Sequence, residues 1–418
     1  MSFVKTPVRG MPEQTPRDME LREYALGKIK STYKKYGFTQ IETPAVEHIE
    51  NLTSKQGGEN EQLIFKILKR GEKLQKSENF DDLCDCGLRY DLTVPLARFY
   101  ANNSNDLPNP FKALQTGPVW RADSPQKGRY RQFTQCDIDI LGDATNLAEM
   151  ELITATANML YELGLGGSKV RVNDRRILKA MASFCGFPEE KHSVIFIILD
   201  KYDKIGLEGV KKSLLELGLE ESGVESYCKF FNGSTDLFSC RDYFRDEWAN
   251  VVPENVISNL EDIIATSRDI LSGKGQVVFD PTLVRGMSYY TGPIFEIELS
   301  SYKLSVAGGG RYDEMIGKYS GGSTPACGFS IGFERIIDIM KNNETPIGAG
   351  DEEKIAYLIT REAPLEKKRE VLQKAAALRE AGVCVLVSMR NKNFYAQKDK
   401  LRLYGYTKFV DVYPDTRL

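Results

Sequence analysis

Residues 283–296 read Leu-Val-Arg-Gly-Met-Ser-Tyr-Tyr-Thr-Gly-Pro-Ile-Phe-Glu, and a buried-strand pattern at residues 275–280 leads into them. The stretch contains one cation, Arg285, and two adjacent phenols, Tyr289 and Tyr290. Arginine presents a rigid fork of donors, and tyrosine presents a hydroxyl on a stiff ring. Two interpretations are open from this stretch alone: the wall of a polar pocket, or an edge strand with surface aromatics. The rest of the chain decides between them.

The length and composition of the chain predict a multidomain globular protein. A chain of 418 residues is too long for one ordinary core, so two or three domains are expected. Its 41% hydrophobic and 28% charged residues are typical of soluble proteins. No run has the length of a membrane helix, and the first residues lack the apolar core of an export signal. We therefore expect a cytoplasmic protein with no membrane partner.

The cysteines and histidines argue against metal chemistry. The eight cysteines are scattered, and the spacing of the one close pair, Cys84 and Cys86, is not that of a metal knuckle. The two histidines, His48 and His192, have no cysteine or histidine close by in the sequence. We therefore predict free thiols in a reducing compartment, no metal-ligating residues and no histidine-based catalytic triad.

The charge is unevenly distributed along the chain. The net charge is −3, which does not suggest a general nucleic-acid binder. Residues 352–418 nevertheless contain more Lys and Arg than Asp and Glu. A basic module on an acidic body is compatible with local contact to a polyanion, although such runs are often only solvated faces.

The first part of the chain alternates helices and strands. Residues 17–36 have helical spacing, and residues 38–44 form a strand pattern that ends at a proline. We interpret this helix and strand as a dimer-interface unit. Further on, Asp91 and Thr93 lie two residues apart, which places them on one face if this segment is extended. Residues 146–163 are predicted to be helical.

A strand, a cationic loop and a second strand follow at residues 111–140. The loop contains four cations, and the second strand places Gln135, Asp137 and Asp139 on one face. We expect the basic tip to hold phosphates and the polar face to hold a polar or cationic ligand. A surface hairpin with a charged turn is the alternative, but it would not explain three polar residues on one face.

The second half of the chain changes texture twice. Residues from about 170 to 270 contain several amphipathic helices and predict an inserted helical module. Residues 305–313 then contain three consecutive glycines, which allow close approach to the backbone. A strand of small residues runs into a helix that begins near Gly332, and residues 353–418 alternate strand, helix, strand, helix.

Together these segments resemble a known family. Glu42-Thr-Pro44, residues 119–140 and Gly332-Phe-Glu-Arg335 resemble, in order, the three signature motifs of the class II aminoacyl-tRNA synthetases. Residues 283–292 (LVRGMSYYTG) and 307–313 (AGGGRYD) look like the two histidine motifs of the histidyl-tRNA synthetases. SPQKGRYRQF at 124–133 and RYDLT at 89–93 fit the same family.

The resemblance implies an α+β fold. Its core is the class II synthetase antiparallel sheet with flanking helices, interrupted by a helical insertion and followed by an α/β anticodon-binding-type domain. The expected domains are residues 1–169 (first part of the catalytic core), 170–272 (helical insertion), 273–342 (second part of the core) and 352–418 (the C-terminal domain, shortened because the family's final strand has no counterpart).

The resemblance also implies a two-step ligase that works as a cytoplasmic homodimer. L-Histidine and Mg-ATP give histidyl-adenylate and pyrophosphate, and the histidyl group then passes to tRNA(His). ATP is a substrate, and Mg²⁺ is bound with it. The reaction belongs to protein biosynthesis.

Residue roles follow from matching the family's motifs. The match assigns Arg285 and Arg121 to catalysis, with Arg121, Phe133 and Arg335 also binding ATP. The residues expected to bind histidine are Asp91, Thr93, Gln135, Asp139, Tyr289 and Tyr290. Gln126 and Arg131 are expected to meet the acceptor end of the tRNA.

Some positions depart from the family pattern. Asp91 and Asp139 stand where bacterial relatives often have Glu, and Asp123 and Ser124 are unusual in motif 2. The main alternative is a non-charging synthetase-like regulatory subunit of ATP phosphoribosyltransferase in histidine biosynthesis. That group usually lacks the catalytic arginine and the basic loop, which this chain has. A non-catalytic RNA-binding protein would not need the three polar residues Asp91, Gln135 and Asp139.

Overall fold

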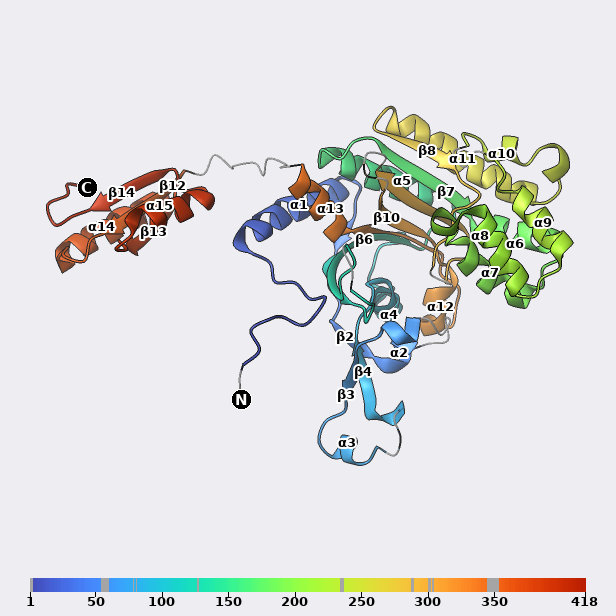
Figure 1. Ribbon diagram of the computed structural model, residues 1–418, viewed down its shortest axis with the longest axis horizontal. Helices are drawn as coiled ribbons and strands as arrows, with labels where there is room; N and C mark the ends of the chain where they lie inside the picture. The colour runs from blue at the N-terminus through green and yellow to red at the C-terminus, as the bar shows by residue number, and fades with distance from the viewer. Residues whose placement is uncertain are drawn as a thin grey trace. The chain divides into compact units, whose positions relative to one another are not determined.

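The computed structural model describes residues 3–53, 60–77, 79, 81–125, 128–233, 237–286, 289–299, 302, 304–343 and 353–418 (Figure 1). The chain divides into two compact units. One comprises residues 1–13 and 25–343, and the other comprises residues 14–24 and 344–418. Within the described ranges, no helix is long and apolar enough to cross a membrane.

The larger unit is built on an eight-stranded sheet with the order β1-β5-β6-β11-β10-β9-β7-β8. Neighbouring strands from β5 to β7 are antiparallel, and the two outer pairs, β1 with β5 and β7 with β8, are parallel. This arrangement confirms the predicted α+β class with an antiparallel central sheet. The strands are β1 (Thr39–Gln40), β5 (Phe111–Trp120), β6 (Gln132–Leu141), β7 (Ser168–Asp174), β8 (Gly275–Phe279), β9 (Pro293–Leu299), β10 (Leu304–Arg311) and β11 (Ala326–Gly332).

The register aligns small and polar residues across the middle of the sheet. Asp137 on β6 lies opposite Ser330 on β11, which lies opposite Gly308 on β10. Gly308 in turn lies opposite Glu296 on β9, and Glu296 lies opposite Arg171 on β7. Because side chains alternate between the two faces of a strand, this row belongs to one face. A polar floor interrupted by a glycine therefore crosses five strands.

Helices cover the sheet, and the apolar side chains of alternating strands supply the core. On β6, Cys136, Ile138 and Ile140 are buried, as the alternation predicted. Helix α5 buries nearly every side chain in its middle, and the Tyr33 hydroxyl of α1 donates a hydrogen bond to Thr156 of α5 at 3.3 Å. These helices are α1 (Pro16–Lys35), α5 (Leu147–Glu162), α11 (Glu254–Leu271) and α13 (Phe333–Asn342).

A helical module is inserted between β7 and β8. Figure 1 shows α6 to α9 gathered together in green beside the sheet. Strand β7 pairs with β9, so residues 170–174, which lie after the predicted boundary at 170, run in the central sheet. The helices are α6 (Arg175–Phe184), α7 (His192–Leu199), α8 (Tyr202–Glu216), α9 (Glu221–Lys229) and α10 (Cys240–Tyr243), with short 3-10 turns at Glu189–Lys191 and Asp246–Trp248.

A small separate sheet with the order β2-β4-β3 is formed by residues near the start of the unit. Its strands β3 and β4 extend away from the main sheet together with α3 (Figure 1). The elements here are β2 (Val46–His48), α2 (Ile49–Thr53), β3 (Lys66–Leu68), α3 (Glu72–Gln75), β4 (Cys84–Leu88), α4 (Thr93–Asn103) and, from later in the chain, α12 (Glu314–Ser320), with 3-10 turns at Asn60–Leu63 and Asp81–Leu83.

The C-terminal unit has a parallel sheet with the order β13-β12-β14. Its elements are β12 (Lys354–Ile359), α14 (Leu365–Glu380), β13 (Cys384–Met389), α15 (Phe394–Leu403) and β14 (Lys408–Val412). The predicted strand, helix, strand and helix are confirmed. Strand β14 was not predicted, because its sequence, Lys-Phe-Val-Asp-Val, is short and partly charged. A small core that includes Tyr357, Val371 and Val412 holds this unit together.

Candidate active site

A cavity of about 580 Å³ lies over the polar floor of the central sheet. Its lining comes from strands β6, β9, β10 and β11, from the turn before α4 and from the α7–α8 junction. All eight residues predicted for catalysis or histidine binding line this cavity, as do the other two predicted for ATP: Asp91, Thr93, Arg121, Phe133, Gln135, Asp139, Arg285, Tyr289, Tyr290 and Arg335. Segments more than 200 residues apart in sequence thus meet at one place.

Three buried carboxylates form one side of the cavity, which we call the carboxylate wall: Asp91, Asp137 and Asp139. Each keeps one oxygen with no hydrogen-bond partner in the described structure: Oδ2 of Asp91, Oδ1 of Asp137 and Oδ2 of Asp139. A buried polar atom without a partner is costly, so such atoms are rare unless a ligand satisfies them. The carboxylate wall is therefore suited to a ligand that carries several N–H donors.

Burial changes the acidity of the carboxylate wall. It raises the pKa of Asp139 to about 7; the Tyr312 hydroxyl, which donates to Oδ1 of Asp139 at 2.6 Å, opposes the rise, while the charge of Asp91 adds to it. Burial, with the nearby Asp139, also raises the pKa of Asp137 well above its usual value. The pKa of Asp91 is also raised, because burial outweighs two effects that lower it: the hydrogen bond from the backbone N–H of Val94 at 3.0 Å and the charge of Arg121.

The segment around Asp91 differs from the prediction. Asp91 and Thr93 do not share a face of an extended strand, because the chain turns after Arg89 and α4 begins at Thr93. Oδ1 of Asp91 accepts the Val94 N–H in the first turn of this helix. A carboxylate at a helix start satisfies an N–H that has no partner within the helix. Both side chains reach the cavity by this route.

Amide, hydroxyl and phenol groups complete this side of the cavity. The Gln135 Nε2 donates to Oγ of Ser330 at 2.8 Å, and its Oε1 has no partner in the described chain. The rings of Tyr289 and Tyr290 have centroids 4.8 Å apart, and the ring of Tyr312 lies 6.0 Å from Tyr289. Polar atoms thus sit on rigid supports, which favours recognition of a small polar ligand.

Three arginines also line the cavity, and we call them the arginine wall: Arg121, Arg285 and Arg335. The Arg121 Nε donates to the carbonyl of Tyr90 at 2.9 Å, and its guanidinium lies 5.1 Å from the centre of the Phe133 ring. The Arg335 Nη1 donates to the carbonyl of Ser305 at 2.5 Å. Each guanidinium is held by a neighbour and still faces the cavity.

Arg285 is fixed by a carboxylate and by a glycine. Its Nη1 pairs with Oε2 of Glu296, while its Nε has no partner among the described residues. A Cβ at Gly308 would lie 2.3 Å from Nη2 of Arg285, so the guanidinium occupies the space that any other side chain would take. Arg285 therefore lies flat against bare backbone with donors left over for a ligand.

Of the two residues predicted for the tRNA acceptor end, the structure describes only Arg131. Gln126 lies outside the described residues. The Arg131 Nε donates to the carbonyl of Asp123 at 3.0 Å, and Arg131 is not among the residues around the cavity. Asp123 and Arg129 of the same loop do line it.

Several lining residues were not predicted. Tyr312, Ser330 and Glu296 hold predicted residues in place, and Asp200 and Lys204 enter from the helical module. Alternation along β11 would have indicated Ser330, since it shares a face with Gly328 and Gly332. Asp200 and Lys204 carry no local signal, because only the tertiary fold brings the α7–α8 junction to the cavity.

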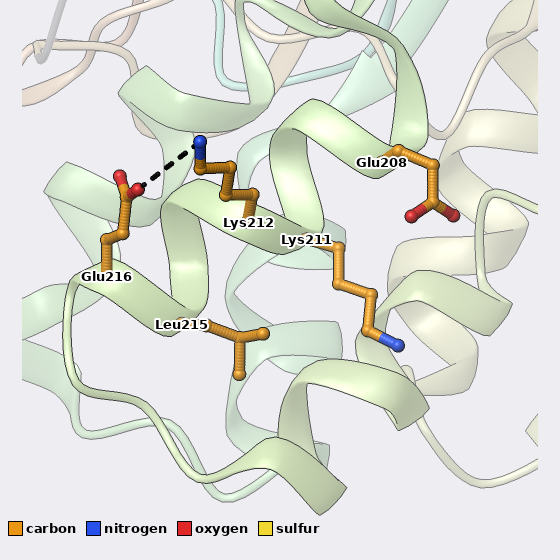
Figure 2. A pocket seen from close by; sticks show the side chains of 5 residues that line it. All are labelled: Glu208, Lys211, Lys212, Leu215 and Glu216. Carbon is orange, nitrogen blue, oxygen red and sulfur yellow. Dashed lines mark ion pairs between the residues drawn. The ribbon is translucent and has the colours of Figure 1, made fainter.

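A second hollow lies on the surface of α8 and is lined by Glu208, Lys211, Lys212, Leu215 and Glu216. Figure 2 shows that these side chains leave one helix in different directions, with the ion pair between Lys212 and Glu216 at 3.9 Å. Both partners of this pair are well exposed, and such pairs contribute little. The hollow has no convergent polar groups, so the first cavity is the candidate active site.

Known proteins resemble the chain closely. A family model for histidyl-tRNA synthetase matches residues 10–336. The histidine–tRNA ligase of Leifsonia xyli is 43% identical over 98% of this chain and 96% of its own length, and that of Aeropyrum pernix is 36% identical over 96% and 88%. The solved histidyl-tRNA synthetase from Nostoc sp. PCC 7120 is 26% identical, with a TM-score of 0.77 over 97% of this chain and 90% of that one.

A further solved structure shares the fold at lower identity. It is described as an ATP phosphoribosyltransferase regulatory subunit/histidyl-tRNA synthetase from Bacillus halodurans, and it covers 98% of this chain and 99% of its own at a TM-score of 0.77 and 20% identity. At that identity the likeness concerns the fold alone. The family model covers most of the chain, and the sequence relatives cover nearly all of it. From these matches and the cavity that joins its motifs, the chain belongs to the histidyl-tRNA synthetase family.

Proposed function

We propose that this chain is a histidine–tRNA ligase, an enzyme that joins L-histidine to tRNA(His) through a histidyl-adenylate. Relatives that carry this name are 43% and 36% identical over almost the whole chain. The observation that carries the proposal is that one cavity is lined by both the carboxylate wall and the arginine wall. An amino acid with two basic nitrogens fits the first wall, and a polyphosphate fits the second.

The first step needs positive charge more than it needs a base. The histidine carboxylate attacks the α-phosphorus of ATP, the bond to the β-phosphate oxygen breaks, and pyrophosphate leaves. This brings two anions together, so fixed cations lower the barrier. In this proposal Arg121 and Arg285 bind the carboxylate and α-phosphate from two sides. Arg335 binds the γ-phosphate end and covers the adenine, which stacks on Phe133.

The carboxylate wall binds the amino acid. Asp91, Thr93 and Gln135 hold the α-amino group and the carboxylate, and Asp139 and Tyr290 bind the imidazole nitrogens. Tyr289 lines the pocket beside Tyr290. The unpartnered oxygens of Asp91, Gln135 and Asp139 support these roles. An amino acid without ring N–H groups would leave them unpaired, and that penalty gives specificity.

ATP would bring Mg²⁺ with it. Mg²⁺ is commonly held by substrate phosphates with one or two carboxylates. Glu334 lines the cavity and provides an oxygen donor of the right kind. We therefore place the ion between the triphosphate and this part of the lining, where it would neutralise phosphate charge. Gln126 and Arg131 are proposed to meet the acceptor end of the tRNA.

The division into domains is also a proposal: catalytic core at 1–169 and 273–342, helical insertion at 170–272 and an anticodon-binding-type domain at 352–418, with residues 170–174 completing strand β7 of the core sheet. The α6–α10 cluster between β7 and β8 and the separate parallel sheet support it. We further propose a homodimer in the cytoplasm. The edge position of β1 next to α1 supports the first part, and eight free cysteines support a reducing compartment.

Charging of histidine tRNA by the purified protein tests the function directly. Labelled histidine should become acid-precipitable with tRNA(His) and ATP present, and should not with a different tRNA. Histidine-dependent exchange between pyrophosphate and ATP tests the first step alone. Exchange without charging would keep adenylate formation and reject the ligase. Absence of both would instead favour the regulatory-subunit alternative.

A further inference from the structure

A continuous chain of ion pairs runs from Arg285 to the helical module. Oε2 of Glu296 pairs with Nη1 of Arg285, and Oε1 of Glu296 lies 3.5 Å from Nη1 of Arg171. The same Nη1 of Arg171 lies 3.3 Å from Oδ2 of Asp203, in the first turn of α8. Arg171 is also anchored by Asp280, whose Oδ2 lies 2.5 Å from its Nε. None of the roles given above uses this chain.

We propose that Glu296 is a positioning residue for Arg285, and that Arg171 and Asp203 make the orientation of Arg285 depend on where the helical module sits. The inference rests on the proposed function, because Arg285 is taken as the arginine that meets the α-phosphate. It goes beyond that function by assigning Glu296, Arg171 and Asp203, which lie outside the groups that bind histidine and ATP.

Two carboxylates act on the Arg285 guanidinium: Glu296, which forms an ion pair with it, and Asp200, whose charge is felt without an ion pair in the described structure, so Glu296 sets its direction. On the Gly308 side, Arg285 meets bare backbone, which supports its plane but offers no side-chain acceptor. An arginine side chain has several rotatable bonds, so a flat support alone does not fix it. Glu296 is itself held at both oxygens, one on each arginine. Because each oxygen of Glu296 pairs with a different arginine, a shift of Arg171 would also shift Glu296 and Arg285.

The α7–α8 junction reaches the cavity beside this chain. Asp200, just after α7, and Lys204, in α8, both line it. Asp203 lies between them, with its side chain 68% exposed, and its contact with Arg171 joins the module to the sheet. A displacement of α8 would remove one of the partners of Arg171 and loosen its hold on Glu296. Through this contact the module would affect adenylate formation although Asp203 does not itself line the cavity.

The main test is Glu296→Gln, measured by histidine-dependent ATP–pyrophosphate exchange. The amide keeps the shape but loses the charge and presents an N–H₂ group to one of the two arginines. We expect kcat to fall about 30-fold, as for a misplaced catalytic group, with KM for histidine changed less than about twofold. A loss of fold would instead lower the amount of active enzyme and the unfolding temperature. Where Glu296→Gln does not fold, Glu296→Asp keeps the charge and shortens the reach, and the same kcat-only loss is expected.

The proposed link between Arg171 and the helical module is tested by Asp203→Asn, with Glu225→Gln as the matched control. Both are exposed carboxylates of the module, and Glu225 pairs with Lys211 at 3.3 Å away from the cavity lining. Asp203→Asn should lower kcat about threefold and leave KM unchanged, consistent with one exposed ion pair, while Glu225→Gln should have no effect. Identical kinetics for the two variants would overturn the proposed link between Asp203 and Arg285. Wild-type kcat in Glu296→Gln would overturn the whole inference, whereas no exchange by the wild-type protein would refute the proposed function instead.

Discussion

The two walls of the cavity are built on opposite principles. The carboxylate wall is buried and incompletely satisfied, with one oxygen of each aspartate left without a partner in the described structure. On the arginine wall, carbonyls of Tyr90 and Ser305 hold two guanidiniums and a carboxylate holds the third. The carboxylate wall therefore needs a ligand or a proton to satisfy its oxygens. The arginine wall is already held by protein groups, and its effect depends on how those groups orient the guanidiniums.

This contrast suits the proposed reaction. Binding a cationic amino acid repays the desolvation of the aspartates, so the energy of that wall is released when histidine arrives. The arginines stabilise charge that appears only during reaction, and preorganisation is what makes such groups effective. Changes to the carboxylate wall should consequently appear in histidine binding, and changes to the arginine wall should appear in kcat. Four variants test this division.

Arg285→Ala should have the largest effect. It removes a fixed cation from the arginine wall, so adenylate formation should fall by at least about 10³-fold in kcat. Histidine binding, measured by equilibrium dialysis, should remain close to wild type. Arg285→Lys should not rescue the reaction, because a point charge cannot replace a fork held by Glu296. Arg241→Ala, which removes an exposed arginine of the module, is the control. Full exchange activity in Arg285→Ala would reject the catalytic role.

Asp139→Asn comes next and should break the carboxylate wall. Replacing a buried carboxylate that is proposed to bind the imidazole should raise KM for histidine about 100-fold, with a smaller change in kcat. Exposed Asp106→Asn is a control for the substitution itself. A variant that loses kcat and keeps its KM would erase the distinction between the two walls.

The same variant has a defined effect on stability. The pKa of Asp139 in the folded protein is about 7, above the ordinary value of 3.8, because burial favours the neutral acid. The contribution of Asp139 to the free energy of unfolding is thus fully present below pH 4 and is lost as the pH rises through 7. Without ligand, Asp139→Asn should unfold at a higher temperature than wild type at pH 8 and show little gain at pH 4. A difference that does not grow with pH would contradict this sign. Asp91 and Asp137 shift in the same direction, so some pH dependence should persist.

Gly308→Ala should damage the arginine wall without removing any functional group. The new methyl would lie 2.3–2.6 Å from atoms of the Arg285 guanidinium, so the arginine must move. We expect kcat for exchange to fall about 30-fold with little change in histidine affinity. Gly322→Ala, which meets no atom within 4 Å, is the matched control. Equal activity of the two variants would show that Arg285 tolerates displacement.

Tyr312→Phe should have the smallest effect. The phenol donates to Asp139 and lowers its pKa, so its loss should raise that pKa and weaken histidine binding about fivefold at neutral pH. The pH at which histidine affinity is half lost should move upward, because more of the Asp139 population becomes protonated. Titration of binding between pH 6 and 9 measures this shift. A downward movement would contradict the assigned direction.

The sequence predicted the parts of the fold that have strong periodicity. The strand at 111–120, the polar and apolar alternation of β6 and the helix that begins next to Gly332 were confirmed. Asp91 was predicted on an extended segment and lies instead before a helix, since the local sequence does not distinguish a strand end from a helix start. Strand β14 was missed because burial, more than propensity, makes its short sequence a strand.

For the site, the motifs in the sequence were enough to propose the functional residues, but not the residues that hold them in place. Arg285 and Asp139 stand in motifs that can be read locally. Glu296 on β9, in contrast, meets Arg285 because the segment between β8 and β9 folds back over the sheet, and Arg171 joins through the register of β7 with β9. Such partners depend on strand order, which one sequence does not specify. Asp200 and Lys204 reach the cavity only through the path of the helical module.

The glycines of β10 and β11 set a limit on redesign. A Cβ at Gly308 would collide with Arg285, and one at Gly328 would lie 2.0 Å from Oδ1 of Asp139. The space beneath the ligand is therefore already filled by the side chains of Arg285 and Asp139. An engineer who wishes to admit a bulkier amino acid analogue gains nothing by altering this floor. New room must come from the aromatic rim at Tyr289, Tyr290 and Tyr312, and laboratory evolution of altered substrate range should accumulate its changes there.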